Sequence, residues 1–252
     1  MKDNYKMTKT EQIEYPNGDK YIGPAKNHKR TGFGVYYSHL GNKYIGNFKD
    51  DSRNGMGLEI FNDNEEFIGE WKNNEFNGKG KYTFSNGDTY EGELSNEKMD
   101  GFGYLCFKSG CEYTGKFKEG KRKGFGIRTY PNKDRYVGEW DNAVKEGCGK
   151  IYFSNGDIYE GQLQNDKRNG YGFYKSTTGD SYEGQWKDDM KDGFGCYTFP
   201  DGTKYEGEYK NDERTGKGFF IFTNGKTQYA SDWIIINIVL LFIVNHINGF
   251  LL

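Results

Sequence analysis

A Gly-x-Gly pair recurs every 23 residues along this chain, nine times in succession and without an insertion. The pairs are Gly32/Gly34, Gly55/Gly57, Gly78/Gly80, Gly101/Gly103, Gly124/Gly126, Gly147/Gly149, Gly170/Gly172, Gly193/Gly195 and Gly216/Gly218. A strict period of roughly 20 to 50 residues is typical of repeat architectures, in which one small unit stacks on the next. Such a chain has little room for a single catalytic constellation, but it builds a long, regular surface.

Large side chains flank a further glycine in each unit. Two residues before it stands an aromatic residue: Tyr21, Tyr44, Phe67, Tyr90, Tyr113, Tyr136, Tyr159, Tyr182 or Tyr205. Two residues after it stands Phe48, Trp71, Leu94, Phe117, Trp140, Leu163, Trp186 or Tyr209, with Ala25 as the departure in the first unit. This period of two is strand spacing, so ring and glycine share a face. We expect that both glycines of each pair also share this face, where a neighbouring ring lies flat on bare backbone.

Turn signals separate the predicted strands. They are Asn17-Gly18, Asn86-Gly87, Asn155-Gly156, Asp201-Gly202 and Asn224-Gly225. We predict type I′ turns here, because both central residues of that turn need positive φ. Lys133 and Asn64 replace the glycine in two units, and there we expect another turn type. The predicted fold is all-β, an elongated single-layer array of antiparallel β-hairpin repeats that forms a twisted meander of about eighteen strands.

The composition excludes several classes of function. Only 34% of residues are hydrophobic and 17% of the chain is aromatic, which indicates a thin aromatic interior. The net charge of -2 gives no basic stripe, so we predict no nucleic-acid partner. The histidines, His28, His39 and His246, are scattered, and the four cysteines form no C-x-x-C motif. We therefore predict no enzyme activity, catalytic residue, metal, cofactor or small-molecule substrate.

The pattern Y-x-G-x-W followed by G-x-G-x-Y-x-F-x-x-G, clear in residues 182–204, resembles the MORN repeat (membrane occupation and recognition nexus) over residues 15–233. The resemblance implies stacked β-hairpins and a non-enzymatic scaffold or targeting protein with protein partners. It also implies membranes, cilia or the cytoskeleton as sites of action, and the family's name suggests phospholipid binding. Because residues 1–20 are polar and show no signal peptide, we interpret the cysteines as reduced thiols and expect a cytoplasmic protein. A second hypothesis stays open: a regulatory array like those of phosphatidylinositol-phosphate kinases or SET-domain methyltransferases, without their catalytic domain.

The face opposite the glycines is also largely apolar. The residue between the two glycines, and the residue two positions later, point to that face and vary between units. A single sheet with apolar side chains on both faces needs a cover, which either its own coiling or a partner could supply. We predict that protein partners bind this face through Phe33, Met56, Phe102, Tyr104, Phe125, Tyr171, Phe173 and Phe194.

The repeat pattern ends before a segment of different composition. A tenth unit begins at Tyr229, displaced by one residue, with Ser231 where glycine belongs. Residues 233–252 contain no Asp, Glu, Lys or Arg. Three hypotheses stay open: a membrane anchor that makes the protein a tail-anchored tether, a cap on the open sheet edge, or a gene-model artefact. The candidate membrane residues are Trp233, Ile238, Leu240, Leu241, Phe242 and Val244. The predicted domains are a polar segment over 1–14, a repeat array over 15–232 and an apolar tail over 233–252.

Overall fold

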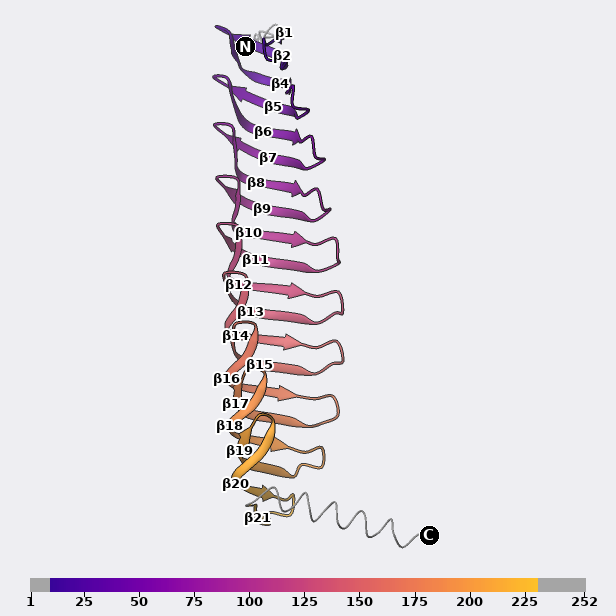
Figure 1. Cartoon of the computed structure of the whole chain (residues 1–252), viewed down its shortest axis with the longest axis vertical. Helices are drawn as coiled ribbons and strands as arrows, with labels where there is room; N and C mark the ends of the chain where they lie inside the picture. Colours follow the sequence, from indigo (N-terminus) through magenta and orange to yellow (C-terminus); the bar gives the residue numbers. More distant parts are fainter. Residues whose placement is uncertain (1–9, 231–252) are drawn as a thin grey trace, which may run out of the picture. The chain divides into compact units, whose positions relative to one another are not determined.

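The computed structural model describes residues 10–230, and its contacts divide the chain into two units, residues 1–131 and 132–252. These described residues form twenty-one strands and no helix (Figure 1). The first unit holds β1 (Thr10–Glu14), β2 (Lys20–Lys26), β3 (Lys29–Arg30), β4 (Gly32–Tyr37), β5 (Lys43–Lys49), β6 (Ser52–Ile60), β7 (Glu66–Lys72), β8 (Glu75–Thr83), β9 (Thr89–Ser95), β10 (Lys98–Cys106), β11 (Glu112–Lys118) and β12 (Lys121–Thr129). The second holds β13 (Arg135–Asp141), β14 (Val144–Tyr152), β15 (Ile158–Gln164), β16 (Lys167–Lys175), β17 (Ser181–Lys187), β18 (Met190–Thr198), β19 (Lys204–Lys210), β20 (Glu213–Ile221) and β21 (Thr227–Ala230).

Within each unit the strands form one antiparallel layer in meander order, as Figure 1 shows. Strands β3 and β4 do not pair with each other, because both pair with β2. The predicted all-β hairpin meander is confirmed. The count exceeds the expected number of about eighteen strands for two reasons. Strands β1 and β21 lie outside the nine repeats, and the first long strand is divided into β3 and β4.

The predicted packing of rings on glycines is confirmed and forms the core. All nine ring positions from Tyr21 to Tyr205 are at most 1% exposed. The ring of Tyr182 lies on its own strand's Gly184 and on Gly195 of the next strand, and a β-carbon at Gly195 would lie 2.5 Å from the ring. Trp186 packs edge-on against this ring, with the centroids 5.2 Å apart. Aromatic pairs of this geometry stabilise beyond the area that they bury.

The first glycine of each pair has a different role from the predicted one. Gly193 has a φ of 107°, and the first glycines of the other eight pairs also have positive φ. Between Gly184 and Trp186 the register shifts, so that three residues of β18 oppose one of β17. The first glycine is therefore part of a β-bulge, where left-handed backbone is needed. The expectation of a ring above both glycines is correct for the second glycine only.

The Asn-Gly turns are not type I′, which corrects the sequence-based prediction. Gly18 has a φ of 91°, whereas Asn17 is absent from the positive-φ residues. The Gly18 amide donates to the Tyr15 carbonyl at 2.9 Å, and the Tyr15 amide donates to the backbone carbonyl of Asp19. This is a three-residue loop in which a type I turn precedes a left-handed residue. Asn64 and Lys133 adopt the same left-handed conformation, with φ of 67° and 74°, so the expected change of turn type there is also wrong.

The two-residue turns with positive φ at both positions lie at the other ends of the hairpins. Asp188 and Asp189, for example, have φ of 49° and 71°. The equivalent positions are Asn27/His28, Asp50/Asp51, Asn73/Asn74, Asn96/Glu97, Glu119/Gly120, Asn142/Ala143, Asn165/Asp166 and Asn211/Asp212. Asn and Asp tolerate left-handed backbone better than other residues with side chains.

The start of the tenth unit keeps the register of the earlier units. Ala230 pairs with Gly218, and Gln228 pairs with Phe220, so Ala230 stands where Gly207 stands one repeat earlier. The predicted one-residue displacement, with Ser231 at the glycine position, is therefore wrong. The candidate membrane residues of 233–252 lie outside the described residues, and the anchor, cap and artefact hypotheses stay predictions. No helix that the structure describes between residues 10 and 230 is long and apolar enough to span a membrane.

Candidate protein-binding face

The eight predicted partner-binding residues all lie on the face opposite the rings, which we call the exposed face. They come from the long strands β4, β6, β10, β12, β16 and β18. Exposure lies between 55% and 64% for the six residues that stand between paired glycines, Phe33, Met56, Phe102, Phe125, Tyr171 and Phe194. Tyr104 and Phe173, two positions further along, are each 38% exposed. Coiling of the sheet within each unit therefore leaves these side chains accessible.

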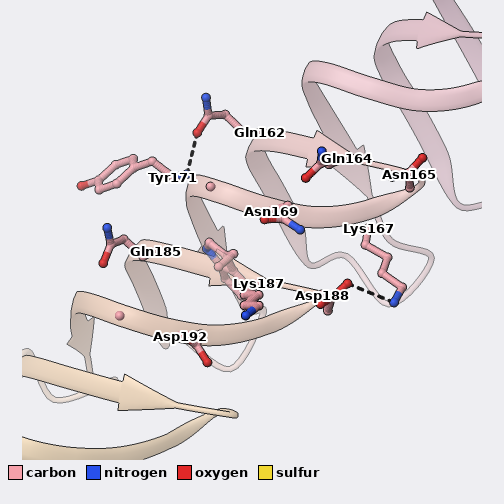
Figure 2. A pocket seen from close by; sticks show the side chains of 13 residues that line it. Gln162, Gln164, Asn165, Lys167, Asn169, Tyr171, Gln185, Lys187, Asp188 and Asp192 are labelled. Atoms are coloured by element: carbon pink, nitrogen blue, oxygen red, sulfur yellow. Dashed lines mark hydrogen bonds and ion pairs between the residues drawn. The ribbon is translucent and has the colours of Figure 1, made fainter.

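The β-bulge holds the most exposed rings in place. In the second unit, Phe194 is part of the bulge, and its amide donates to the Gln185 side chain at 2.8 Å. The Tyr171 amide donates to the Gln162 side chain at 2.7 Å in the same way, which Figure 2 shows. These bonds satisfy amide groups that the bulge removes from the strand ladder. The ring thus projects from a fixed backbone, which reduces the entropy lost when a partner binds.

The first unit adds an aliphatic row to this face, and the three isoleucines of the row were not predicted from the sequence. Ile22, Val35, Ile45, Leu58 and Ile68 are successive cross-strand partners. The row ends at Lys81, which pairs with Ile68 on one side and Glu91 on the other. Its sequence signal is the residue between the ring and the strand glycine, which is isoleucine in the first three repeats. A hollow of about 510 Å³ next to the row is lined by Met56 and Phe102, among others.

In the second unit the same row alternates between apolar and acidic residues. Phe173, Glu183, Cys196, Glu206 and Phe219 are successive cross-strand partners. The Tyr171 hydroxyl donates to the Glu183 carboxylate at 3.1 Å, and this bond raises the pKa of Tyr171.

Beside this alternating row, a hollow of about 480 Å³ is lined by Tyr171, Phe194 and Phe219 together with Glu183, Glu206 and Lys217. Phe219 and Tyr229, each 49% exposed, have ring centroids 5.2 Å apart. The sequence analysis did not select this pair.

A larger, polar hollow of about 930 Å³ lies near the two-residue turns of the second unit (Figure 2). Its amide groups include those of Gln162 and Gln185, which already accept bonds from the bulge amides. Lys167 pairs with Asp188 at 3.1 Å across the same hollow. The two glutamines are thus engaged in holding the backbone, and the lysine and the aspartate are engaged with each other. Among residues 10–230, no cluster of three or more His, Cys, Asp or Glu side chains could hold a metal ion.

The ring face carries a column of cations that the sequence analysis also missed. The Arg168 guanidinium lies 4.2 Å from the centre of the Trp186 ring and pairs with Asp189 at 3.1 Å. Lys191 lies within 6 Å of three tyrosine ring centres, and burial lowers its pKa. The column recurs two residues before each glycine pair, with Phe76 and Met99 as departures. These cations cover the aromatic core, so we assign them a structural role.

The solved structures that match this chain in backbone structure share little sequence with it. The TCP10 domain of CPAP from Danio rerio, in complex with a STIL peptide, is 13% identical and covers 89% of this chain and 100% of its own, at a TM-score of 0.43. Virginiamycin B lyase from Staphylococcus aureus is 10% identical and covers 88% of this chain and 83% of its own, at a TM-score of 0.19. Neither likeness is strong enough to bear on function. No curated protein matches the sequence.

The MORN repeat pattern, by contrast, matches most of the chain. It does so over residues 26–39, 44–66, 67–89, 90–112, 113–135, 136–158, 159–181, 182–204 and 205–227. These matches follow the hairpin units of the structure, with one short strand and one long strand in each full repeat. The chain belongs to the MORN repeat family.

Proposed function

We propose that this protein is a non-enzymatic scaffold that binds protein partners on the exposed face of its repeats. The observation that carries the proposal is the set of bulge residues from Phe33 to Phe194 that are more than half exposed. Monomeric proteins rarely expose contiguous apolar patches of this kind unless a partner binds them. Aromatic side chains and methionine are also the residues enriched where partners bind.

The ring face does not offer an equal surface. Its rings are at most 1% exposed and its large second side chains, such as Trp186, are at most 6% exposed. The burial of these side chains already stabilises the packing of one hairpin on the next. A protein partner therefore gains more apolar contact on the exposed face.

Affinity capture with two matched variants tests the proposal. F102S/F194S removes one exposed ring from each unit, and K79S/C148S changes the same repeat position in each unit where no ring stands. We expect wild type and K79S/C148S to retain the same partners by mass spectrometry, and F102S/F194S to lose them. An unchanged partner set for F102S/F194S would exclude the exposed face as the binding surface.

The sites of action implied by the family, at membranes, cilia or the cytoskeleton, remain part of the proposal. So does binding to phospholipid, for which the net charge of -2 supplies no general attraction. A regulatory role beside a catalytic domain would use the same exposed face. The proteins retained in the capture experiment therefore also distinguish a ciliary, a cytoskeletal and an enzyme-associated setting.

A further inference from the structure

We propose that the exposed face of the second unit binds a helical partner segment with two Lys or Arg residues seven positions apart and apolar residues between them. The two cations lie over Tyr171 and Phe194, beside the carboxylates of Glu183, Glu206 and Glu208. The inference rests on the proposed scaffold function and names the chemistry of the partner.

The first unit shows how the chain itself uses a cation at this position. Lys116 is the cross-strand partner of Phe102, and its ammonium group lies 5.3 Å from the centre of that ring. A cation above an aromatic face is attracted by the electrons of the ring. Phe102 therefore has an internal cation, supplied by the next strand.

The second unit lacks this internal cation. The cross-strand partners of Tyr171 and Phe194 are Gln185 and Glu208, an amide and a carboxylate. Among residues 10–230, no Lys or Arg lies over either ring, although both rings are more than half exposed. These are surfaces on which a cation from a partner gains both ring contact and a nearby opposite charge.

The three carboxylates nearest these two rings are also without ion pairs. Glu160, nearer the start of the unit, pairs with Lys150 at 2.8 Å. Glu183, Glu206 and Glu208 form no such pair within the part of the chain that the structure describes. The hollow that Glu183 and Glu206 line has a single ammonium group, that of Lys217, against these two carboxylates. The charge of this surface is thus complementary to a basic segment.

The spacing of the rings selects a helix. Tyr171 on β16 and Phe194 on β18 are separated by β17, so their strands lie about 9.6 Å apart. Residues i and i+7 of a helix lie on one side about 10.5 Å apart. Residues on one side of an extended strand recur at about 6.7 Å, which does not match. Helix residues i+3 and i+4 lie between the two cations and cover the hollow, of which Phe219 forms one apolar wall.

The test is fluorescence anisotropy with the full chain and two labelled peptides. Each is an Ala- and Leu-based helix of about 18 residues with two charged residues seven positions apart on the apolar side. One peptide carries lysines and the other glutamates. We expect the lysine peptide to bind about tenfold more tightly than the glutamate peptide. E206Q/E208Q should weaken its binding about fivefold, whereas E70Q on the exposed face of the first unit should leave it unchanged.

Three results would overturn the inference. They are absence of measurable binding of the lysine peptide, equal binding of the two peptides, and equal weakening by E70Q and by E206Q/E208Q. All three substitutions are isosteric and lie on an exposed face, so circular dichroism should show unchanged folding. The scaffold function is judged separately. If F102S/F194S loses captured partners while E206Q/E208Q keeps them, the scaffold function stands and the basic-helix inference fails.

Discussion

The ring of Tyr182 lies against the backbone of Gly195 on the next strand, so closely that a β-carbon at Gly195 would be 2.5 Å from a ring carbon. A methyl group there forces the ring out of its place. We expect G195A to destabilise the protein by about 2–3 kcal/mol through overpacking. G225A is the comparison, because a β-carbon at Gly225 meets nothing within 4 Å and only the positive φ of 77° opposes a side chain there. It should cost only the backbone strain, about 1 kcal/mol. Equal urea midpoints for the two variants would contradict this account of the core.

The hydroxyl of each core tyrosine from Tyr21 to Tyr182 bonds to a carbonyl three residues later on its own strand. Tyr182 donates to Gln185 at 2.9 Å and Tyr136 donates to Glu139 at 2.8 Å. Phe67 stands at the same repeat position without a hydroxyl. We expect Y182F to lower the free energy of unfolding by about 1 kcal/mol, and F67Y to raise it by a similar amount. Urea unfolding measures both, and a destabilised F67Y variant would show that this bond does not stabilise the hairpin.

Lys133 occupies a turn position that most other repeats give to glycine. Its φ of 74° is left-handed, a conformation that costs a residue with a β-carbon about 1 kcal/mol. We therefore expect K133G to raise the free energy of unfolding by about 1 kcal/mol. N64G, at the equivalent turn with a φ of 67°, should raise it by less, because asparagine tolerates this conformation. Thermal unfolding of both variants checks the order, and a gain for N64G alone would contradict it.

The turn carboxylate of Asp157 gives the fold a pH dependence. It accepts the Tyr174 hydroxyl at 2.5 Å and the Thr177 amide of the next repeat at 2.9 Å. These bonds, led by that from Tyr174, lower the pKa of Asp157 to about 2, below the unfolded value of about 3.9. The resulting stability is present above about pH 4 and is lost as the pH falls toward about 2.

Urea midpoints of wild type, Y174F and D157N across this acid range test that dependence. Y174F removes the leading cause of the shift, so its midpoint should fall less steeply with acid than that of wild type. D157N should flatten the dependence further, because no carboxyl group remains at this position. Parallel curves for all three proteins would show that Asp157 does not carry the effect.

The hairpin meander and its aromatic core could be predicted from sequence because both depend on local periodicity. Tyr182, Gly184 and Trp186 alternate at strand spacing, and the partner Gly195 follows at a fixed interval. The turn types could not be predicted in the same way. Asn-Gly suits both a two-residue turn and the end of a three-residue loop. Only the pairing of Tyr15 with Asp19 across the loop decides between them.

The bulge explains why the candidate site was only partly predictable. Gly193 and Gly195 are the same residue type, so the sequence does not distinguish their roles. Gly193 has left-handed backbone, whereas Gly195 lies under the Tyr182 ring. The exposed position of Phe194 followed from alternation, whereas its fixation by Gln185 required the bulge geometry. The three isoleucines of the aliphatic row were not selected, because the row arises from register across five strands and not from any one strand.

Hydroxyl-radical footprinting of the protein with and without a captured partner tests the central claim most directly, because it reports which side chains the partner covers. The account predicts protection of exposed-face rings such as Phe102 and Phe194, with unchanged oxidation of the ring-face residues Tyr174 and Tyr197. Protection of Tyr174 and Tyr197, with Phe102 and Phe194 oxidised as in the free protein, would place the partner on the ring face and contradict the account.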